Sequence, residues 1–214
     1  MKPPLAVILI LSACLWEGCT LENTPRPSNS LPNVYRAVSQ LPPELHRIAV
    51  LPVTVAATDL ASEEGRDALE PILYAELQKR AVAELVVVTR DELWNLTGRR
   101  EWRTIDALPA DFFERLHQAT GCDAYVFCDL TYFRAYPPLE IGWKLQLVDV
   151  RKRTLWAVDE AFDASNASVA AAACHYGGAT PFWTFSEEAG TILESPRQFG
   201  RYAAATVLKT MPTR

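Results

Sequence analysis

The chain has 214 residues, of which 49% are hydrophobic and 22% charged, and its formal net charge is -5. This length allows one domain of ordinary size with its own core plus a short appendage, and the composition is that of a globular protein. The acidic balance, without a stripe of Lys and Arg, argues against a surface that neutralises phosphates. We therefore expect no nucleic-acid partner.

The start of the chain has the layout of an export signal. Lys2 supplies a positive charge, residues 5–11 form an apolar run, and two small residues precede Cys14. The run is shorter than the roughly 20 apolar residues that span a bilayer. We predict a signal peptide over residues 1–13. Two alternatives stay open: the run is a buried strand, or cleavage falls before Cys19.

Leu11-Ser12-Ala13-Cys14 resembles the lipobox of bacterial lipoproteins. The resemblance implies lipidation of Cys14, with acyl chains such as palmitate. Because one acyl chain anchors only marginally and two or more hold stably, such a cysteine tethers a protein without a transmembrane helix. In that family a non-acidic residue after the cysteine, here Leu15, implies sorting to the outer membrane, with the protein facing the periplasm; the inner membrane is the weaker alternative.

A change in composition follows the lipobox. Residues 14–45 contain five prolines among Ser, Asn and Thr, with little apolar periodicity. This composition is typical of an extended tether. We predict a lipidated, Pro-rich tether over residues 14–45 and a globular domain over residues 46–210.

The first half of this domain alternates strands and helices. Residues 47–53 and 85–88 are short, β-branched apolar runs that predict buried strands. Between them Leu69, Leu73 and Leu77 recur at helical spacing, and we place the start of that helix near Pro71, a residue that helices tolerate in the first turn. Asp67 and Glu70, just before it, then act as helix caps.

Two further helices are predicted after the second strand. Asp91 is placed to cap a short helix through Leu96, and Pro109 suits the start of another helix. Gly121 suits the end of that helix, because glycine accepts a left-handed cap.

The second half of the domain carries the clearest β pattern. Residues 124–136 are apolar and aromatic, residues 141–147 alternate apolar and polar side chains, and residues 151–154 predict a turn into a strand over 155–162. An antiparallel hairpin thus joins the earlier strand-helix units. The predicted fold class is α/β (α+β): one domain with a mixed sheet of about five strands and helices packed on it.

Two helices complete the prediction. Alanines favour a helix over residues 167–174, and Ser195, Pro196 and Gln198 form a helix start with a cap, a first-turn proline and a capping-box side chain. Between them, residues 177–194 include an aromatic loop. It is interpreted either as a lid over the core or as a contact surface for a partner.

The residues that carry chemistry do not form a recognisable site. The three histidines, His46, His117 and His175, are scattered over a linker end, a helix and a loop, and the chain has no nucleophile elbow, phosphate loop or dinucleotide motif. The adjacent pair Cys174 and His175 is the one suggestive combination, but neighbouring residues rarely face the same way. We expect no catalytic residue, no cofactor and no enzyme.

Cysteine spacing also predicts no metal site. The five cysteines include no CxxC pair and no zinc-like His/Cys spacing. With Cys14 assigned to lipid, one disulfide is possible in the oxidising periplasm, but its connectivity is open. The remaining cysteines are Cys19, Cys122, Cys128 and Cys174.

The order of several short strings resembles a superfamily of bacterial envelope lipoproteins. It includes the curli secretion channel lipoprotein, the penicillin-binding protein activator lipoproteins and the amino-terminal domain of the Tol-Pal periplasmic protein. The strings are residues 48–52, 87–93, 120–126, 147–150 and 155–156. The sequence departs from the superfamily pattern at Val53 and at Cys128-Asp129.

The resemblance implies a non-catalytic interaction or regulatory module for a cell-envelope complex, for example in cell-wall synthesis or envelope assembly. We therefore expect an envelope protein partner and membrane attachment through the lipid. Two alternatives stay open: a homo-oligomeric accessory of a secretion or export apparatus, and an enzyme with an unrecognised site near Asp129, Cys174 and His175.

Overall fold

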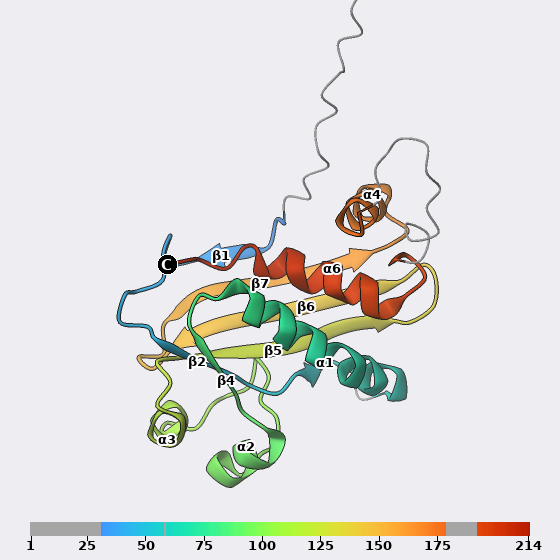
Figure 1. The fold of residues 1–214 in the computed structure, drawn as a ribbon. Helices are drawn as coiled ribbons and strands as arrows, with labels where there is room; N and C mark the ends of the chain where they lie inside the picture. Colours follow the sequence, from blue (N-terminus) through green and yellow to red (C-terminus); the bar gives the residue numbers. More distant parts are fainter. Residues whose placement is uncertain (1–30, 58, 179–191) are drawn as a thin grey trace, which may run out of the picture.

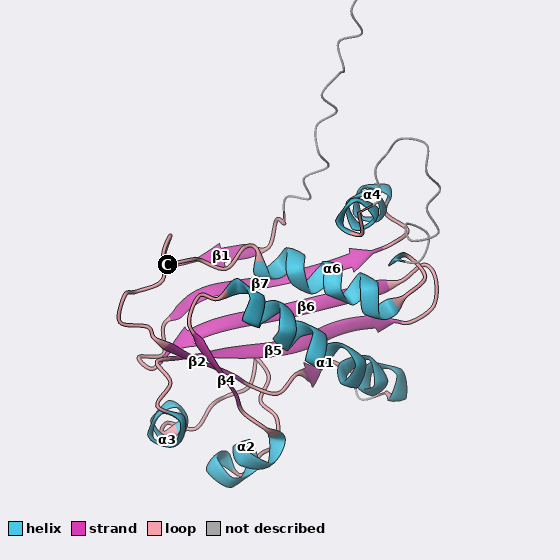
Figure 2. Cartoon of the chain, viewed as in Figure 1, coloured by secondary structure: helices cyan, strands magenta, loops and turns pink. Residues whose placement is uncertain are grey.

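A mixed sheet with helices on both faces forms the body of the molecule (Figures 1 and 2). The computed structural model describes residues 31–57, 59–178 and 192–214. Its strands are β1 (Val34–Arg36), β2 (Arg47–Val50), β3 (Thr54–Val55), β4 (Glu84–Val87), β5 (Ala124–Arg134), β6 (Glu140–Asp149) and β7 (Thr154–Asp163). Its helices are α1 (Leu60–Arg80), α2 (Arg90–Thr97), α3 (Phe112–Thr120), α4 (Ala167–Tyr176) and α6 (Pro196–Leu208).

The sheet combines a parallel part with an antiparallel part. Its strand order is β1-β7-β6-β5-β2-β4, and the short β3 pairs with β5. β2 runs parallel to both β4 and β5, because helical crossovers return the chain to the same end of the sheet before each strand begins. β5, β6 and β7 form an antiparallel meander, and β1 adds to β7, also antiparallel. The predicted mixed sheet with its C-terminal hairpin is confirmed.

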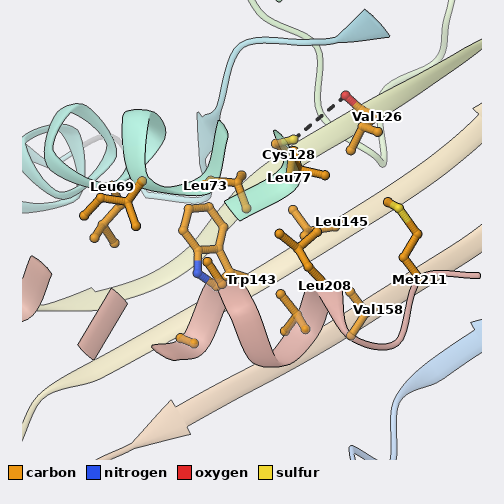
Figure 3. Packing of buried hydrophobic residues seen from close by; sticks show 14 of the residues in the cluster. Leu69, Leu73, Leu77, Val126, Cys128, Trp143, Leu145, Val158, Leu208 and Met211 are labelled. Carbon is orange, nitrogen blue, oxygen red and sulfur yellow. Dashed lines mark hydrogen bonds between the residues drawn. The ribbon is translucent and has the colours of Figure 1, made fainter. Parts of the chain in front are cut away.

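One face of the sheet is covered by α1 and α6, which lie side by side across it (Figure 1). Every second residue of the central strands points into this layer, where Trp143 of β6 packs beside Leu69 and Leu73 of α1 and Leu208 of α6 (Figure 3). Trp143 is fully buried. This layer is the larger of the two apolar cores, so it contributes most of the hydrophobic stabilisation.

The opposite face has a smaller core that covers only part of the sheet. Phe112 and Phe113 of α3 pack edge-on to each other and against Phe127 of β5, and Trp102 contacts Phe112. Leu93 of α2 completes this layer. These side chains lie over β2, β4 and β5, and this restricted coverage positions the candidate site described below.

The start of α1 differs from the prediction. The helix begins at Leu60, capped by the side chain of Asp59, which accepts a hydrogen bond from the Ser62 amide. Pro71 therefore lies inside α1 and not in its first turn. Proline there removes one helical hydrogen bond, but the packing of Leu69, Leu73 and Leu77 against the sheet holds the helix together across it.

Several local signals have the predicted effect. Gly121 ends α3 with φ of 64°, and Ser195 caps α6 with Pro196 in the first turn. α2 begins one residue before the predicted cap at Asp91: its cap is Thr89, which forms a reciprocal capping box with Glu92. Caps of this kind satisfy amide groups that the first helical turn leaves without partners.

The folded body begins earlier than predicted. Val34–Arg36 forms β1, and Leu41 and Leu45 are buried in the larger core, although all lie within the predicted 14–45 tether. Pairing with β7 satisfies the backbone of this proline-rich segment, and its few leucines find apolar contacts, so composition alone misplaced the boundary. Together with β3, this strand raises the number of strands from about five to seven.

Some predicted features lie outside the described residues. They are the signal peptide, Cys14, Cys19 and residues 179–191 of the 177–194 segment. No helix within 31–57, 59–178 and 192–214 is long and apolar enough to cross a membrane.

Candidate functional site

The structure places the three histidines on separate elements. His46 precedes β2, and His117 lies on α3, where its Nδ1 is 2.8 Å from the carbonyl oxygen of Cys122. His175 lies on α4 beside Cys174. The hydrogen bond of His117 ties the end of its helix to the start of β5, which is a structural role.

The two cysteines of β5 and its approach are buried thiols. Cys122 and Cys128 are fully buried, and each Sγ contacts a backbone carbonyl two residues earlier in the chain. Burial raises the pKa of both thiols, since a thiolate loses its hydration there. Their thiolate fraction at neutral pH is therefore small, which makes them poor nucleophiles.

Asp129, the acidic residue of the enzyme alternative, forms hydrogen bonds inside the fold. Its carboxylate is buried and accepts hydrogen bonds from the hydroxyl of Thr54 at 2.7 Å and from the hydroxyl and amide of Thr104 at 2.6 and 3.1 Å. These bonds join β3 and the 98–111 loop to β5. Asp129 lies on β5 and Cys174 on α4, so the residues of that alternative come from different elements.

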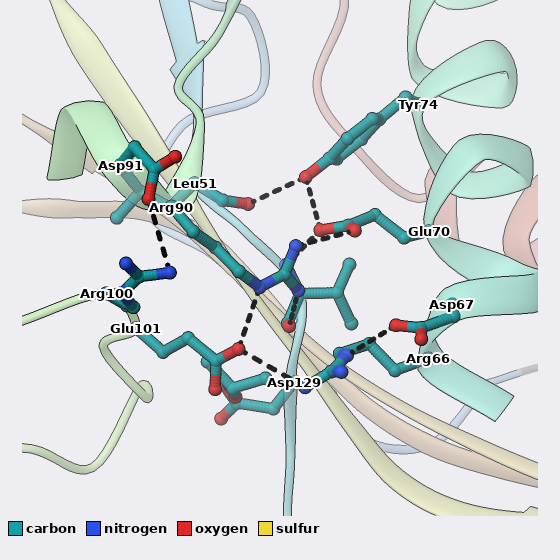
Figure 4. A network of polar contacts seen from close by, with 12 residues as sticks. Leu51, Arg66, Asp67, Glu70, Tyr74, Arg90, Asp91, Arg100, Glu101 and Asp129 are labelled. Atoms are coloured by element: carbon teal, nitrogen blue, oxygen red, sulfur yellow. Dashed lines mark hydrogen bonds and ion pairs between the residues drawn. The ribbon is translucent and has the colours of Figure 1, made fainter. Parts of the chain in front are cut away.

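A partly buried polar network surrounds Arg90 at the start of α2 (Figure 4). The guanidinium of Arg90 donates to Glu70 at 2.9 Å, to Glu101 at 2.9 Å and to the carbonyl oxygen of Val53 at 2.9 Å. Glu70 also accepts from the hydroxyl of Tyr74 at 2.8 Å. The network connects α1, α2 and the segments after β2 and α2, and each charged group in it has an opposite charge beside it.

The electrostatics of this network favour its ionised arginine. Burial alone lowers the pKa of Arg90, but its hydrogen bonds to Glu70 and Glu101 outweigh that effect and raise the pKa. The pKa of Tyr74 is raised by burial and by nearby negative charge. Glu70, which was predicted as a helix cap, instead lies inside α1 and joins this helix to α2 through its ion pair with Arg90.

The structure also bears on metal binding. Among the residues described, no group of three or more His, Cys, Asp and Glu side chains is placed to hold a metal ion.

The candidate site is the part of the second sheet face that α2 and α3 leave uncovered. Residues paired across antiparallel strands point to the same side, and two such rows cross the sheet, of which the first ends beside α3. One row places Tyr35, Ala157 and Gln146 next to Phe127, and the other places Ala161 and Gly142 next to Tyr132. Because Phe127 contacts α3, both rows lie on the α3 side of the sheet.

We call this area the open sheet surface and define it by Tyr35, Tyr132, Lys144, Ala157, Asp159 and Ala161.

Two exposed aromatic side chains bracket a centre of small residues. Tyr35 is 55% exposed and Tyr132 is 48% exposed. Between them lie Ala157 and Ala161, and Lys144 pairs with Asp159 at 3.1 Å. Exposed tyrosines are enriched at protein interfaces. This arrangement suits docking of a protein partner.

Sequence reasoning did not find this surface. The alternation over residues 141–147 predicted a strand with one polar face, but which polar face stays uncovered depends on where the helices end. The signal present in the sequence is the small size of the polar-face residues Gly142, Ala157 and Ala161. Solvent-facing strand positions more often carry longer polar side chains.

No protein-family model matches the chain, and no curated protein matches it.

Solved structures with a similar fold are found. The chain is similar to the PelC dodecamer from Paraburkholderia phytofirmans, with 11% identity, 85% of this chain and 96% of that chain covered, and a TM-score of 0.46. It is similar to lipoprotein GNA1162 from Neisseria meningitidis, with 20% identity, 55% and 79% coverage and a TM-score of 0.38. It is also similar to the LpoB C-terminal domain from Escherichia coli, with 13% identity, 59% and 86% coverage and a TM-score of 0.35.

The resemblance is one of fold.

Proposed function

We propose that this chain is a lipid-anchored envelope lipoprotein that acts as a non-catalytic docking module for a protein partner in the periplasm. Lipid on Cys14 holds it to the periplasmic face of the outer membrane. The open sheet surface is the part that binds the partner.

The anchor is supported by the start of the sequence. The apolar run over residues 5–11 ends in the lipobox at Cys14, and the folded body begins near Val34. About twenty residues therefore separate the lipid from the first strand. At about 3 Å per residue when extended, they place the domain up to several nanometres from the membrane.

The observation that carries the docking role is the pair of exposed tyrosines on a sheet face whose centre carries alanines. Tyr35 and Tyr132 come from strands on opposite sides of β6 and β7, so they bracket the surface and do not form one local bump. Tyrosine contributes strongly to interfaces because it offers a large apolar ring with a polar end at low entropic cost. A partner with a flat complementary face gains contacts with both rings at once.

The anchor is tested by metabolic labelling with a fatty-acid analogue. The full chain is expected to incorporate label, and Cys14→Ala is expected to lose it and leave the outer-membrane fraction. Cys19→Ala is the matched control and retains label. Label retained in Cys14→Ala contradicts the anchor.

The docking role is tested by crosslinking in cells followed by purification of the full chain. Ala157→Arg and Ala161→Arg place a long charged side chain on the open sheet surface and are expected to abolish the captured partner. Glu64→Arg, on the exposed side of α1, is the control and leaves capture unchanged. Recovery of only further copies of this chain supports the homo-oligomeric alternative instead. Equal capture by all variants contradicts the assignment of the surface.

A further inference from the structure

A pocket of about 320 Å³ opens between the 98–111 loop, α3 and the turn that joins β6 to β7. Its apolar part is formed by the buried rings of Phe113 and Phe127. Its polar part is formed by Arg103, Lys152 and Thr154. The volume is in the range of pockets that hold small organic ligands.

Arg103 is the unusual member of this pocket. Within the described ranges, its guanidinium forms no hydrogen bond or ion pair, and its Nε is buried without a hydrogen-bond partner. Buried donors are nearly always satisfied in folded proteins, so an unsatisfied one requires an explanation. An anion bound in the pocket supplies it, because a guanidinium offers two parallel N–H groups to a carboxylate.

The rest of the polar wall also offers donors. Lys152 Nζ donates one hydrogen bond, to the carbonyl oxygen of Ala110 at 3.0 Å, and its other N–H groups remain for a ligand. The hydroxyl of Thr154 accepts from Gln146 at 2.7 Å, which leaves its own O–H as a donor. A ligand that accepts hydrogen bonds is therefore matched to this wall.

The charge of the pocket is positive although the chain is acidic. Arg103 and Lys152 are its cations, and Asp106 is its acidic residue. The Asp106 carboxylate is already engaged: it pairs with Arg99 at 3.0 Å and accepts the Arg103 amide at 3.1 Å. The two cations thus face the pocket without an anion of their own.

The backbone conformation of Lys152 also supports a binding role for this pocket. Its φ is 65°, a left-handed conformation that favours glycine or asparagine. A lysine at such a position is conformationally unfavourable, and in this turn it provides a cation at the pocket. Strain of this kind supports a functional role once a site is indicated by other observations.

We infer that this pocket binds a small organic carboxylate whose apolar part packs against Phe127 and whose carboxylate is held by Arg103 and Lys152. The pocket adjoins the open sheet surface, because Gln146 and Phe127 at the end of one row line it, but none of the residues that define that surface does. It gives the protein a means of sensing a soluble anion in addition to docking a partner.

Benzoate is a suitable probe, titrated against the full chain by calorimetry and by amide NMR shifts, because it combines a carboxylate with a ring of suitable size. We expect one site with a dissociation constant of about 1 mM, as small ligands of this size give. Benzamide has the same shape without the charge and is expected not to bind. Inorganic phosphate is the second anion and is expected to bind more weakly, because it has no apolar part.

Four variants test the assignment. Arg103→Gln is expected to weaken benzoate binding at least tenfold, and Lys152→Gln about threefold. Thr154→Val is expected to weaken it about twofold to threefold without a change of charge. Arg151→Gln, in the same turn but outside the pocket, is the matched control and binds as the parent does.

A structural role for Arg103 is distinguished by stability. Because its guanidinium forms no bond in the described chain, Arg103→Gln is expected to keep or raise the melting temperature. Benzoate binding that is unchanged in Arg103→Gln, equal binding of benzamide, or tighter binding of phosphate overturns the inference.

Discussion

Nη1 of Arg90 lies 2.9 Å from Oε2 of Glu70, and this ion pair connects the first turn of α2 to the middle of α1. The side chains are 29% and 15% exposed, so solvent screens the pair only in part. The same guanidinium holds Glu101 and the carbonyl oxygen of Val53. One arginine thereby joins three segments that are far apart in the sequence.

Replacing Arg90 is expected to destabilise the fold. Arg90→Met leaves Glu70 partly buried without a cation and Glu101 with Arg66 alone, and is expected to lower the free energy of unfolding by about 2–3 kcal/mol. Urea denaturation measures this. The control is Arg100→Met, whose pair with Asp91 is exposed; its effect is expected to be below about 0.5 kcal/mol. Equal losses of stability in Arg90→Met and Arg100→Met contradict a stabilising role for the network around Arg90.

The contact between α1 and α6 depends on Gly200. A Cβ at this position would overlap Cδ2 of Leu69, so a larger side chain displaces that leucine. Gly200→Val is expected to cost about 1–3 kcal/mol through overpacking. The double-mutant cycle with Leu69→Ala compares losses in the free energy of unfolding. The loss in the double mutant is expected to be smaller than the sum of the two single losses by at least about 0.5 kcal/mol. Strict additivity contradicts this contact.

Acid is expected to weaken the helix starts of α1 and α2. The pKa of Asp59 is lowered mainly by the hydrogen bond from the Ser62 amide, and the pKa of Glu92 by that from the Thr89 amide. Because the pKa of each carboxylate is lower in the folded state, its stabilisation of the fold is complete above the unfolded pKa of about 4. This stabilisation is lost as the pH falls through the folded-state pKa.

We therefore expect the urea midpoint to fall as pH drops below about 4, and to fall less steeply in Asp59→Asn and Glu92→Gln. Glu64→Gln, also on α1 but exposed and outside the cap, is the control with the parent slope. Identical slopes in all four proteins contradict the role of the caps.

Lys152 is expected to strengthen ligand binding at the expense of the stability of the fold. Lys152→Gly removes the left-handed strain at φ of 65° and is expected to raise the free energy of unfolding by up to about 1 kcal/mol. The same change removes a cation from the pocket, so benzoate binding is expected to weaken. Arg151→Gly, whose φ is not positive, is the control and is expected to gain no stability. A loss of stability in Lys152→Gly contradicts the argument.

Local sequence patterns determined most of the strands and helices. The alternation over residues 141–147 predicted β6, Gly121 predicted the end of α3, and Ser195 with Pro196 predicted the start of α6. Such signals work because burial of one face and the needs of a helix terminus are set by neighbours within a few residues. The lipobox resemblance at Cys14 also rests on adjacent residues alone, and it stays a prediction.

Long-range contacts decided the remaining features. β1 is only three residues long and exists because β7, more than a hundred residues away, supplies its hydrogen-bond partners. Pro71 was placed in a first turn, yet tertiary packing extends α1 well before it. The pairing of Arg90 with Glu70, the uncovered half of the sheet and the pocket at Arg103 also depend on segments distant in sequence. Local periodicity says that a face is apolar or polar, but only the folded chain decides what covers it.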